Sequence, residues 1–353
     1  MPPPHDGNVH LPFAELMKLR KIDDTTYQSI ALPFTPGGQL RRSVDRAYGG
    51  HVYAQAAWAA AQTVTEGFHI YNVVGTFILG GQLTIPFIYH IHKIRDGRSI
   101  ASRAVTVTQG DSDAICFSGL ISFKTPESSL IDVQEPVDLW EKYKVVLHGK
   151  KPADFPDAPS MDIPWFLAMQ KETGYKDDFP GLDQTKPDMT PYDADRHPLD
   201  RRGLMFYRAC GDMPPDPNLH LCAHLYASDR NSLYLIPMQM GIGDLWTQMS
   251  SLVHMTSFHS STEDLMFGPS KSNVHPMDDT SKRGRWFANE DWSTRSSNGR
   301  TMFHGRMFAP DGTQVATLTQ DGMIRYTKKP QATPEEAEEL RRRQRQWKAK
   351  GKL

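Results

Sequence analysis

The sequence predicts an α+β fold in which one structural unit occurs twice along the chain. An alanine-rich, helix-compatible segment at 50–64 is followed by four strand-like runs that end at residue 124. A helix-compatible segment and four strand-like runs recur between 228 and 326. In both halves a turn, Gly110-Asp111 or Pro310-Asp311-Gly312, precedes an apolar strand. A helix followed by four antiparallel strands favours a layered unit in which the helix covers one face of the sheet.

Length and composition limit the class of protein. The 353 residues, of which 39% are hydrophobic and 23% charged, can form about two domains with ordinary buried cores. The formal net charge of -1 offers no basic stripe for a phosphate backbone, so we expect no nucleic-acid partner. No apolar run approaches the roughly 18 residues of a membrane helix, and a secretory signal is lacking, so we expect an intracellular protein without a membrane span. The 3 cysteines show no zinc-binding spacing, and we expect neither a metal nor a cofactor.

The first domain is predicted to span residues 1–124. Its helix at 50–64 carries short alanine side chains, which suit close packing against a sheet. The strands are rich in β-branched and aromatic residues and are separated by glycine-containing turns, which favours antiparallel pairing. They are expected at 69–79, 84–94, 98–109 and 113–124.

The composition changes in residues 125–219, where prolines and aspartates are frequent. This composition is typical of a long linker that packs on the surface. We expect short helices within it, around 137–143 and 165–170. The boundary between the two domains is therefore placed in this segment.

The second domain is predicted to span residues 220–328, with a helix near 228–241. Its strands are expected at 250–257, 285–291, 301–308 and 314–326. Residues 329–353 are predicted to form a charged helix and tail, because Thr333-Pro334-Glu335-Glu336 is a capping box with proline at the first helical position. Gly351-Lys352-Leu353 is similar to the Ser-Lys-Leu peroxisomal address, so the expected compartment is the cytoplasm or the peroxisome.

Four short motifs occur in order along the two domains. Residues 48–56 read Tyr-Gly-Gly-His-Val-Tyr-Ala-Gln-Ala, and residues 94–99 read Ile-Arg-Asp-Gly-Arg-Ser. Residues 225–229 read Leu-Tyr-Ala-Ser-Asp, and residues 319–322 read Thr-Gln-Asp-Gly. These motifs resemble those of the TesB-like type II acyl-CoA thioesterases, in which the third motif opens the second central helix. The resemblance implies a double hotdog, that is, two tandem hotdog domains with an antiparallel sheet wrapped on a central helix in each.

The resemblance also implies a chemistry. Members of the family hydrolyse acyl-CoA by activating a water molecule with an aspartate, a serine or threonine, and a glutamine. The glutamine falls on Gln320 and the hydroxyl on Thr294, with Ser293 and Ser296 as alternatives. A carboxylate would accept the proton of the water while the other two groups hold the attacking oxygen. The aspartate position falls on Val253, whose side chain cannot accept a proton.

Substrate binding is expected at the first motif and at Val253. Tyr48, Gly49, Gly50 and His51 open the first predicted helix. The two glycines allow a ligand or a sheet backbone to approach the helix N-terminus. Free N–H groups at such a terminus can polarise a thioester carbonyl.

Valine at position 253 makes other residues candidates for proton transfer. These are His254, His259 and Asp291, with Glu290 as an alternative carboxylate. Histidine has a suitable pKa near neutrality, although a single histidine on a strand is more often a hydrogen-bonded structural residue. Residues 260–282 resemble an insertion, which we expect to act as a lid or specificity element beside the pocket.

Three functional hypotheses therefore stay open. The first is an acyl-CoA thioesterase-like hydrolase with an altered site. The second is a dehydratase, lyase or cyclase that acts on a specialised metabolite, since loss of the water-activating group with retention of the pocket is what a change of reaction requires. The third is a noncatalytic acyl-binding protein. In each case the expected ligand is an acyl-CoA or another small molecule, and exposed sheet edges favour a homo-oligomer.

Overall fold

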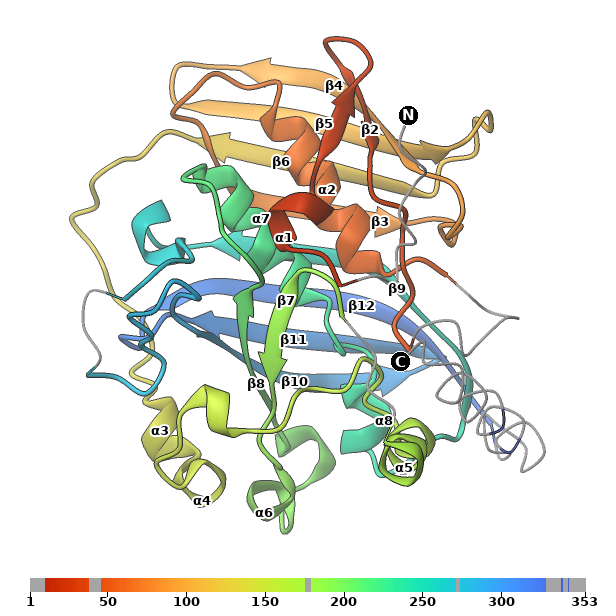
Figure 1. The fold of residues 1–353 in the computed structure, drawn as a ribbon, viewed down its shortest axis with the longest axis vertical. Helices are drawn as coiled ribbons and strands as arrows, with labels where there is room; N and C mark the ends of the chain where they lie inside the picture. Colours follow the sequence, from red (N-terminus) through yellow and green to blue (C-terminus); the bar gives the residue numbers. More distant parts are fainter. Residues whose placement is uncertain are drawn as a thin grey trace.

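The described chain forms one antiparallel sheet of 12 strands that packs on two central helices (Figure 1). This computed structural model describes residues 10–37, 46–174, 179–270 and 274–327, together with positions 338 and 342. The strand order is β1-β2-β4-β5-β6-β3-β9-β12-β11-β10-β8-β7. Read from each edge of the sheet toward its centre, the two sets of six strands follow the same order, so the sheet consists of two similar halves. The predicted α+β double hotdog is confirmed.

The first half holds the N-terminal hotdog. Its elements are α1 (Phe13–Leu16), β1 (Leu19–Lys21), β2 (Thr26–Ser29), α2 (Gly49–Ala61), β3 (His69–Phe77), β4 (Phe87–Asp96), β5 (Ile100–Gln109) and β6 (Phe117–Lys124). The helix and the four strands predicted between 50 and 124 are confirmed, and the short strands β1 and β2 are additional. Most of α2 is buried, because its alanine side chains let it lie close to the sheet and to the second central helix.

The second half repeats this arrangement. Its elements are β7 (Leu182–Thr185), β8 (Gly203–Ala209), α7 (Pro217–Ser228), α8 (Leu235–Gln239), β9 (Trp246–Phe258), β10 (Phe287–Ser297), β11 (Arg300–Phe308) and β12 (Gln314–Tyr326). The four predicted strands are confirmed, but the segment predicted as the helix of this half, 228–241, contains only the short helix α8. The central helix α7 ends at Ser228, where the predicted one began. Asp216 caps its start by accepting a hydrogen bond from the Asn218 N–H, and Pro217 occupies its first turn, which are ordinary start signals.

Residues 125–219 are more than the linker that their composition predicted. The two short helices expected there correspond to α3 (Leu139–Lys142) and α5 (Pro164–Thr173), and α4 (Lys144–Leu147) and α6 (Thr190–Asp193) are additional. The segment also supplies β7 and β8, and β8 pairs with β10 so that Tyr207 lies opposite Phe287. Strands β7 and β8 therefore complete the second half of the sheet, as β1 and β2 complete the first half.

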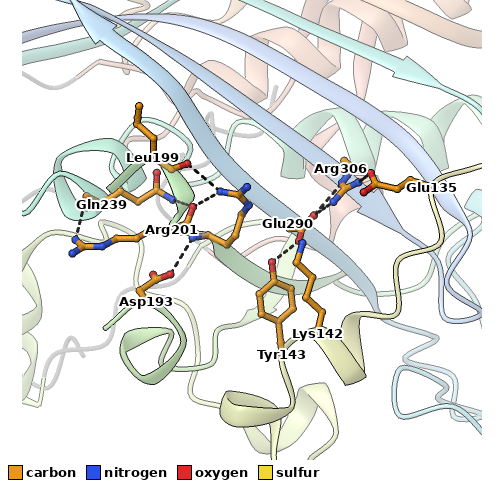
Figure 2. A network of polar contacts seen from close by, with 10 residues as sticks. Glu135, Lys142, Tyr143, Asp193, Leu199, Arg201, Gln239, Glu290 and Arg306 are labelled. Carbon is orange, nitrogen blue, oxygen red and sulfur yellow. Dashed lines mark hydrogen bonds and ion pairs between the residues drawn. The ribbon is translucent and has the colours of Figure 1, made fainter. Parts of the chain in front are cut away.

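A buried ion cluster attaches the segment after β6 to the second half of the sheet (Figure 2). Glu290 on β10 is fully buried and accepts hydrogen bonds from Lys142, Tyr143 and Arg306. Arg306 on β11 also pairs with Glu135. Burial opposes ionisation of Glu290, but the hydrogen bonds from Lys142 and Tyr143 and the nearby positive charges outweigh it and lower the pKa of this carboxyl. The cluster therefore holds α3 against the face of the sheet that points away from α7.

Strands β3 and β9 form the seam between the two halves. They pair antiparallel, with Asn72 opposite Ser257 and Gly75 opposite His254. None of the described helices is long and apolar enough to cross a membrane. The predicted helix and tail at 329–353, including Gly351-Lys352-Leu353, lie outside the described residues apart from positions 338 and 342.

Candidate active site

Three polar side chains meet beside the seam between the two halves. Asp229 follows the last residue of α7, Ser251 lies on β9 and Gln320 on β12. The Gln320 amide donates from Nε2 to Asp229 Oδ1 at 2.7 Å and to Ser251 Oγ at 2.5 Å. The Ser251 hydroxyl donates to the same Asp229 oxygen at 3.2 Å. Asp229 and Gln320 are buried and Ser251 is partly exposed, so the group is open to solvent on the serine side.

The carboxylate of Asp229 lies at the N-terminus of α2. It accepts a hydrogen bond from the backbone N–H of Gly50. A Cβ atom at Gly49 would come within 2.8 Å of Asp229 Oδ2, so a residue without a side chain is needed there. The N-terminal end of a helix dipole attracts negative charge and helps to stabilise the ionised form. The predicted binding residues Gly49 and Gly50 are thus adjacent to a carboxylate that the sequence had not assigned.

Burial gives Asp229 a pKa suited to proton transfer. It raises the pKa of this carboxyl to about 6, against the hydrogen bonds from Gln320, Ser251 and the Gly50 N–H, which lower it. The group is mostly ionised at neutral pH, yet its affinity for a proton is higher than that of an exposed aspartate. A general base is most effective when its pKa lies near the operating pH. Asp229 therefore has the position and the acidity of a base.

A β-bulge in β9 turns Ser251 toward Asp229. Asp321 on β12 pairs with Val253, but the next residue, Gly322, pairs with Ser251, so Leu252 is the extra residue in β9. Strict alternation from the inward residue His254 would point Leu252 inward and Ser251 outward. Bulges commonly re-aim side chains in this way next to active sites.

His254 lies beside this group but does not have the acidity predicted for it. It is fully buried, pairs with Gln320 across β9 and β12, and its Nε2 lies 2.7 Å from Ser228 Oγ. Its ring also packs edge-on against Tyr53. Burial lowers the pKa of His254 to about 3, so the imidazole is neutral at neutral pH. This histidine is thus a poor proton carrier there, which counts against the predicted role in acid–base catalysis.

The structure does not bring four other predicted residues to the group. Val253 is 36% exposed on the opposite face of the sheet from His254, so the position to which the family aspartate was assigned does not face Gln320. Thr294 is exposed and contacts His304, and His259 is exposed and contacts Thr317. Asp291 is buried on β10 with Asn289 as its hydrogen-bond partner, and β11 separates it from Gln320. The hydroxyl that contacts Gln320 is that of Ser251, not that of Thr294.

Two predicted binding residues are core residues at the start of α2. The Tyr48 hydroxyl donates to the backbone oxygen of Tyr226 at 2.6 Å, and its ring packs against Phe34. A Cβ atom at Gly50 would lie 2.5 Å from the Tyr48 ring. His51 is fully buried and lies against Phe34. These side chains fix the position of the helix N-terminus from inside the protein.

The loop predicted as a lid packs on the other end of α7. The Leu265 backbone oxygen lies 2.8 Å from His224 Nε2, and the Phe267 N–H donates to His220 Nδ1 at 2.8 Å. Both histidines precede Asp229 along the helix. The described parts of the loop therefore brace α7, whose C-terminal end presents the carboxylate.

Asp229 and Ser251 are the residues that sequence reasoning missed. Asp229 stands in the Leu-Tyr-Ala-Ser-Asp motif at 225–229, which carried the resemblance without receiving a role. Ser251 stands two residues before Val253, the position to which the family aspartate was assigned. The motif contained a usable signal for Asp229, whereas the bulge that presents Ser251 has no evident one.

Known proteins resemble this chain in sequence and in fold. Residues 40–124 match the sequence model of the acyl-CoA thioesterase N-terminal domain, and residues 152–324 match that of the C-terminal domain. The chain is 24% identical to acyl-CoA thioesterase 2 of Haemophilus influenzae, over 88% of this chain and 96% of the relative. It is 25% identical to mouse acyl-coenzyme A thioesterase 8, over 82% of each. The fold is similar to the crystal structure of acyl-CoA thioesterase II TesB2 from Mycobacterium marinum, with 21% identity and a TM-score of 0.59. The superposition includes 90% of this chain and 98% of the TesB2 chain. The chain therefore belongs to the acyl-CoA thioesterase family, in its TesB-like type II branch.

Proposed function

We propose that this protein hydrolyses acyl-CoA thioesters to a free acid and CoA, with Asp229 as the general base. The observation that carries the proposal is the convergence of Asp229, Ser251 and Gln320 at the N-terminus of α2. The family of the chain and the names of its relatives support the substrate class.

The proposed reaction needs no covalent intermediate. Ser251 and Gln320 carry the hydrogen-bonding groups that orient a water molecule beside Asp229. The carboxylate takes a proton from this water as its oxygen bonds to the thioester carbonyl carbon. The positive end of α2 stabilises the negative charge that develops on the carbonyl oxygen. The carbon–sulfur bond then breaks, and protonated Asp229 returns the proton to the leaving thiolate.

Hydrolysis is the best supported of the three hypotheses. The dehydratase, lyase or cyclase was motivated by Val253 together with the inserted loop at 260–282, and the noncatalytic protein by the missing aspartate. Asp229 supplies a carboxylate next to a glutamine and a hydroxyl, so a missing carboxylate no longer supports either alternative.

The test is thiol release from a panel of acyl-CoAs of different chain lengths, followed with a thiol-reactive dye. We expect release by the natural protein and a loss of about 100- to 10,000-fold in the Asp229→Asn variant, the usual contribution of a general base. Asp291→Asn is the matched control, because Asp291 is also a buried aspartate of the second half but lies away from Gln320. The folded natural protein releasing no thiol from any acyl-CoA would contradict the proposal.

A further inference from the structure

The amide of Gln320 is engaged at one end only. Its Nε2 donates to Asp229 and to Ser251, whereas its Oε1 is buried and has no hydrogen-bond partner among the described residues. A buried amide oxygen without a donor is unfavourable, because it loses its hydrogen bonds to water and gains none in the protein. Rotating the amide by half a turn would place this oxygen against the carboxylate of Asp229, which is repulsive. A hydrogen-bond donor beside Oε1 would satisfy this oxygen and further favour the observed orientation of the amide.

His254 is placed to be that group. It lies directly opposite Gln320 in the pairing of β9 with β12, and both side chains are fully buried. Its Nδ1 also lacks a full hydrogen bond within the described part of the chain. Hydrogen bonding to Gln320 acts to raise the pKa of His254, although burial dominates and lowers it. The neutral ring carries one hydrogen, on either Nδ1 or Nε2.

The two forms of the ring differ in how Ser228 and the Gln320 Oε1 are paired. The Ser228 hydroxyl donates to the backbone oxygen of Leu225 at 2.7 Å, and the same hydroxyl oxygen lies 2.7 Å from His254 Nε2. With the hydrogen on Nε2, the bare Nδ1 and the Gln320 Oε1 would be two buried acceptors without a donor between them. With the hydrogen on Nδ1, the ring donates toward Oε1, and Nε2 accepts the single Ser228 hydroxyl hydrogen in place of the Leu225 oxygen. Only the second form gives a donor both to the Gln320 Oε1 and to the ring nitrogen that carries no hydrogen.

We propose that His254 is a positioning residue, whose Nδ1–H holds the Gln320 amide with Nε2 toward Asp229. A chain of hydrogen bonds then runs from Ser228 through His254 and Gln320 to the carboxylate. Its catalytic consequence rests on the proposed hydrolase function. The hydrogen bond from Gln320 lowers the pKa of Asp229, so loss of the histidine should raise this pKa further.

The first experiment is independent of any substrate. Nitrogen-15 NMR of the imidazole side chains shows which ring nitrogen carries the hydrogen, and the His254→Asn spectrum identifies the signals of this residue. We expect hydrogen on Nδ1, with no protonation of the ring down to about pH 4. Hydrogen on Nε2 would overturn the proposal whatever the protein hydrolyses.

The second experiment measures catalysis in matched variants. For His254→Leu we expect kcat to fall on the order of 10- to 100-fold, as for other supporting hydrogen bonds, with KM within about threefold of the natural value. The acidic limb of the pH–rate profile should also move to higher pH. His254→Asn places an amide N–H where Nδ1 was, so it should recover most of kcat and the natural pH limb. Thr256→Val, the next inward residue of β9, controls for damage to the strand and should keep natural kinetics.

The outcomes separate the two proposals. Equal losses in His254→Leu and His254→Asn with an unmoved pH limb would mean that the histidine only fills space. If the natural protein releases no thiol, the proposed function fails, and the NMR result still decides how Gln320 is held.

Discussion

The carboxylate of Asp229, at the end of α7, accepts a hydrogen bond from the backbone N–H of Gly50 in the first turn of α2. The two helices belong to different halves of the sheet and pack against each other. The candidate site therefore forms where the two hotdogs meet, with the carboxylate from one and the helix terminus from the other. This arrangement accounts for the glycine pair in the first motif, since Gly49 leaves room for the carboxylate.

Gly49→Ala should impair catalysis by displacing Asp229. The added methyl would lie 2.8 Å from Asp229 Oδ2 and 3.0 Å from the Phe77 ring, so the carboxylate or the helix must shift. Small displacements of a catalytic group are costly, and we expect thiol release to fall at least about tenfold. Gly268→Ala is the control, because nothing lies within 4 Å of its added methyl. A natural rate in Gly49→Ala would contradict the close approach of Asp229 to Gly49.

The rate should rise with pH through the ionisation of Asp229. Burial raises the pKa of this carboxyl to about 6, and only the ionised form accepts a proton from water. We expect kcat/KM to increase tenfold per pH unit well below 6 and to level off above about 7. Neutral His254, with a pKa of about 3, should add no second step in this range. A pH–rate profile from pH 4.5 to 8.5 measures this, and a flat profile would exclude Asp229 as the base.

The same carboxyl should make the folded protein less stable as the pH rises. A carboxyl whose pKa is raised by folding binds its proton more tightly in the folded state, so stability is highest below the ordinary pKa of 3.8 and falls as pH rises through about 6. This change corresponds to about 3 kcal/mol. Asp229→Asn cannot ionise, so its unfolding free energy relative to the natural protein should increase by about that amount from pH 4 to pH 8. Urea titrations at both pH values measure the difference, and a decrease instead would show that the ionised form is not disfavoured by folding.

The strands of the two halves were predictable because their alternating apolar residues face a buried layer, as in β5 and β12. Strands β7 and β8 were not, because they are embedded in a segment rich in proline and aspartate. Gln320 was found through its motif and its place on an apolar strand. Asp229 was missed because its motif was assigned to the start of a helix instead of the end. The inward direction of the Ser251 side chain depends on a one-residue bulge, which a strict period-two alternation of side chains does not predict.

Val253→Asp tests the corrected position of the carboxylate. If position 253 were the site of a lost family aspartate, restoring it would raise the rate of thiol release. Val253 instead faces away from Gln320, so we expect no gain, within about twofold. A gain of tenfold or more, measured with the same acyl-CoA panel, would restore the earlier assignment.

Glu290→Gln should destabilise the protein without changing the chemistry of the site. Glu290 is fully buried on the other face of the sheet from Gln320, and the variant would leave Lys142 and Arg306 facing a neutral amide (Figure 2). Burial disfavours the charge of Glu290, but its hydrogen bonds and positive neighbours lower its pKa, so its stabilising effect is present above the ordinary pKa of 4.5 and is lost as pH falls through the folded value. We expect a loss of about 2–3 kcal/mol at pH 7 that shrinks toward pH 4, with thiol release per folded molecule unchanged. Glu141→Gln removes an exposed carboxylate paired with Lys144 and should have no measurable effect. Equal unfolding midpoints of the Glu290→Gln variant and the natural protein at pH 7 would show that the ion cluster does not hold α3 on the sheet.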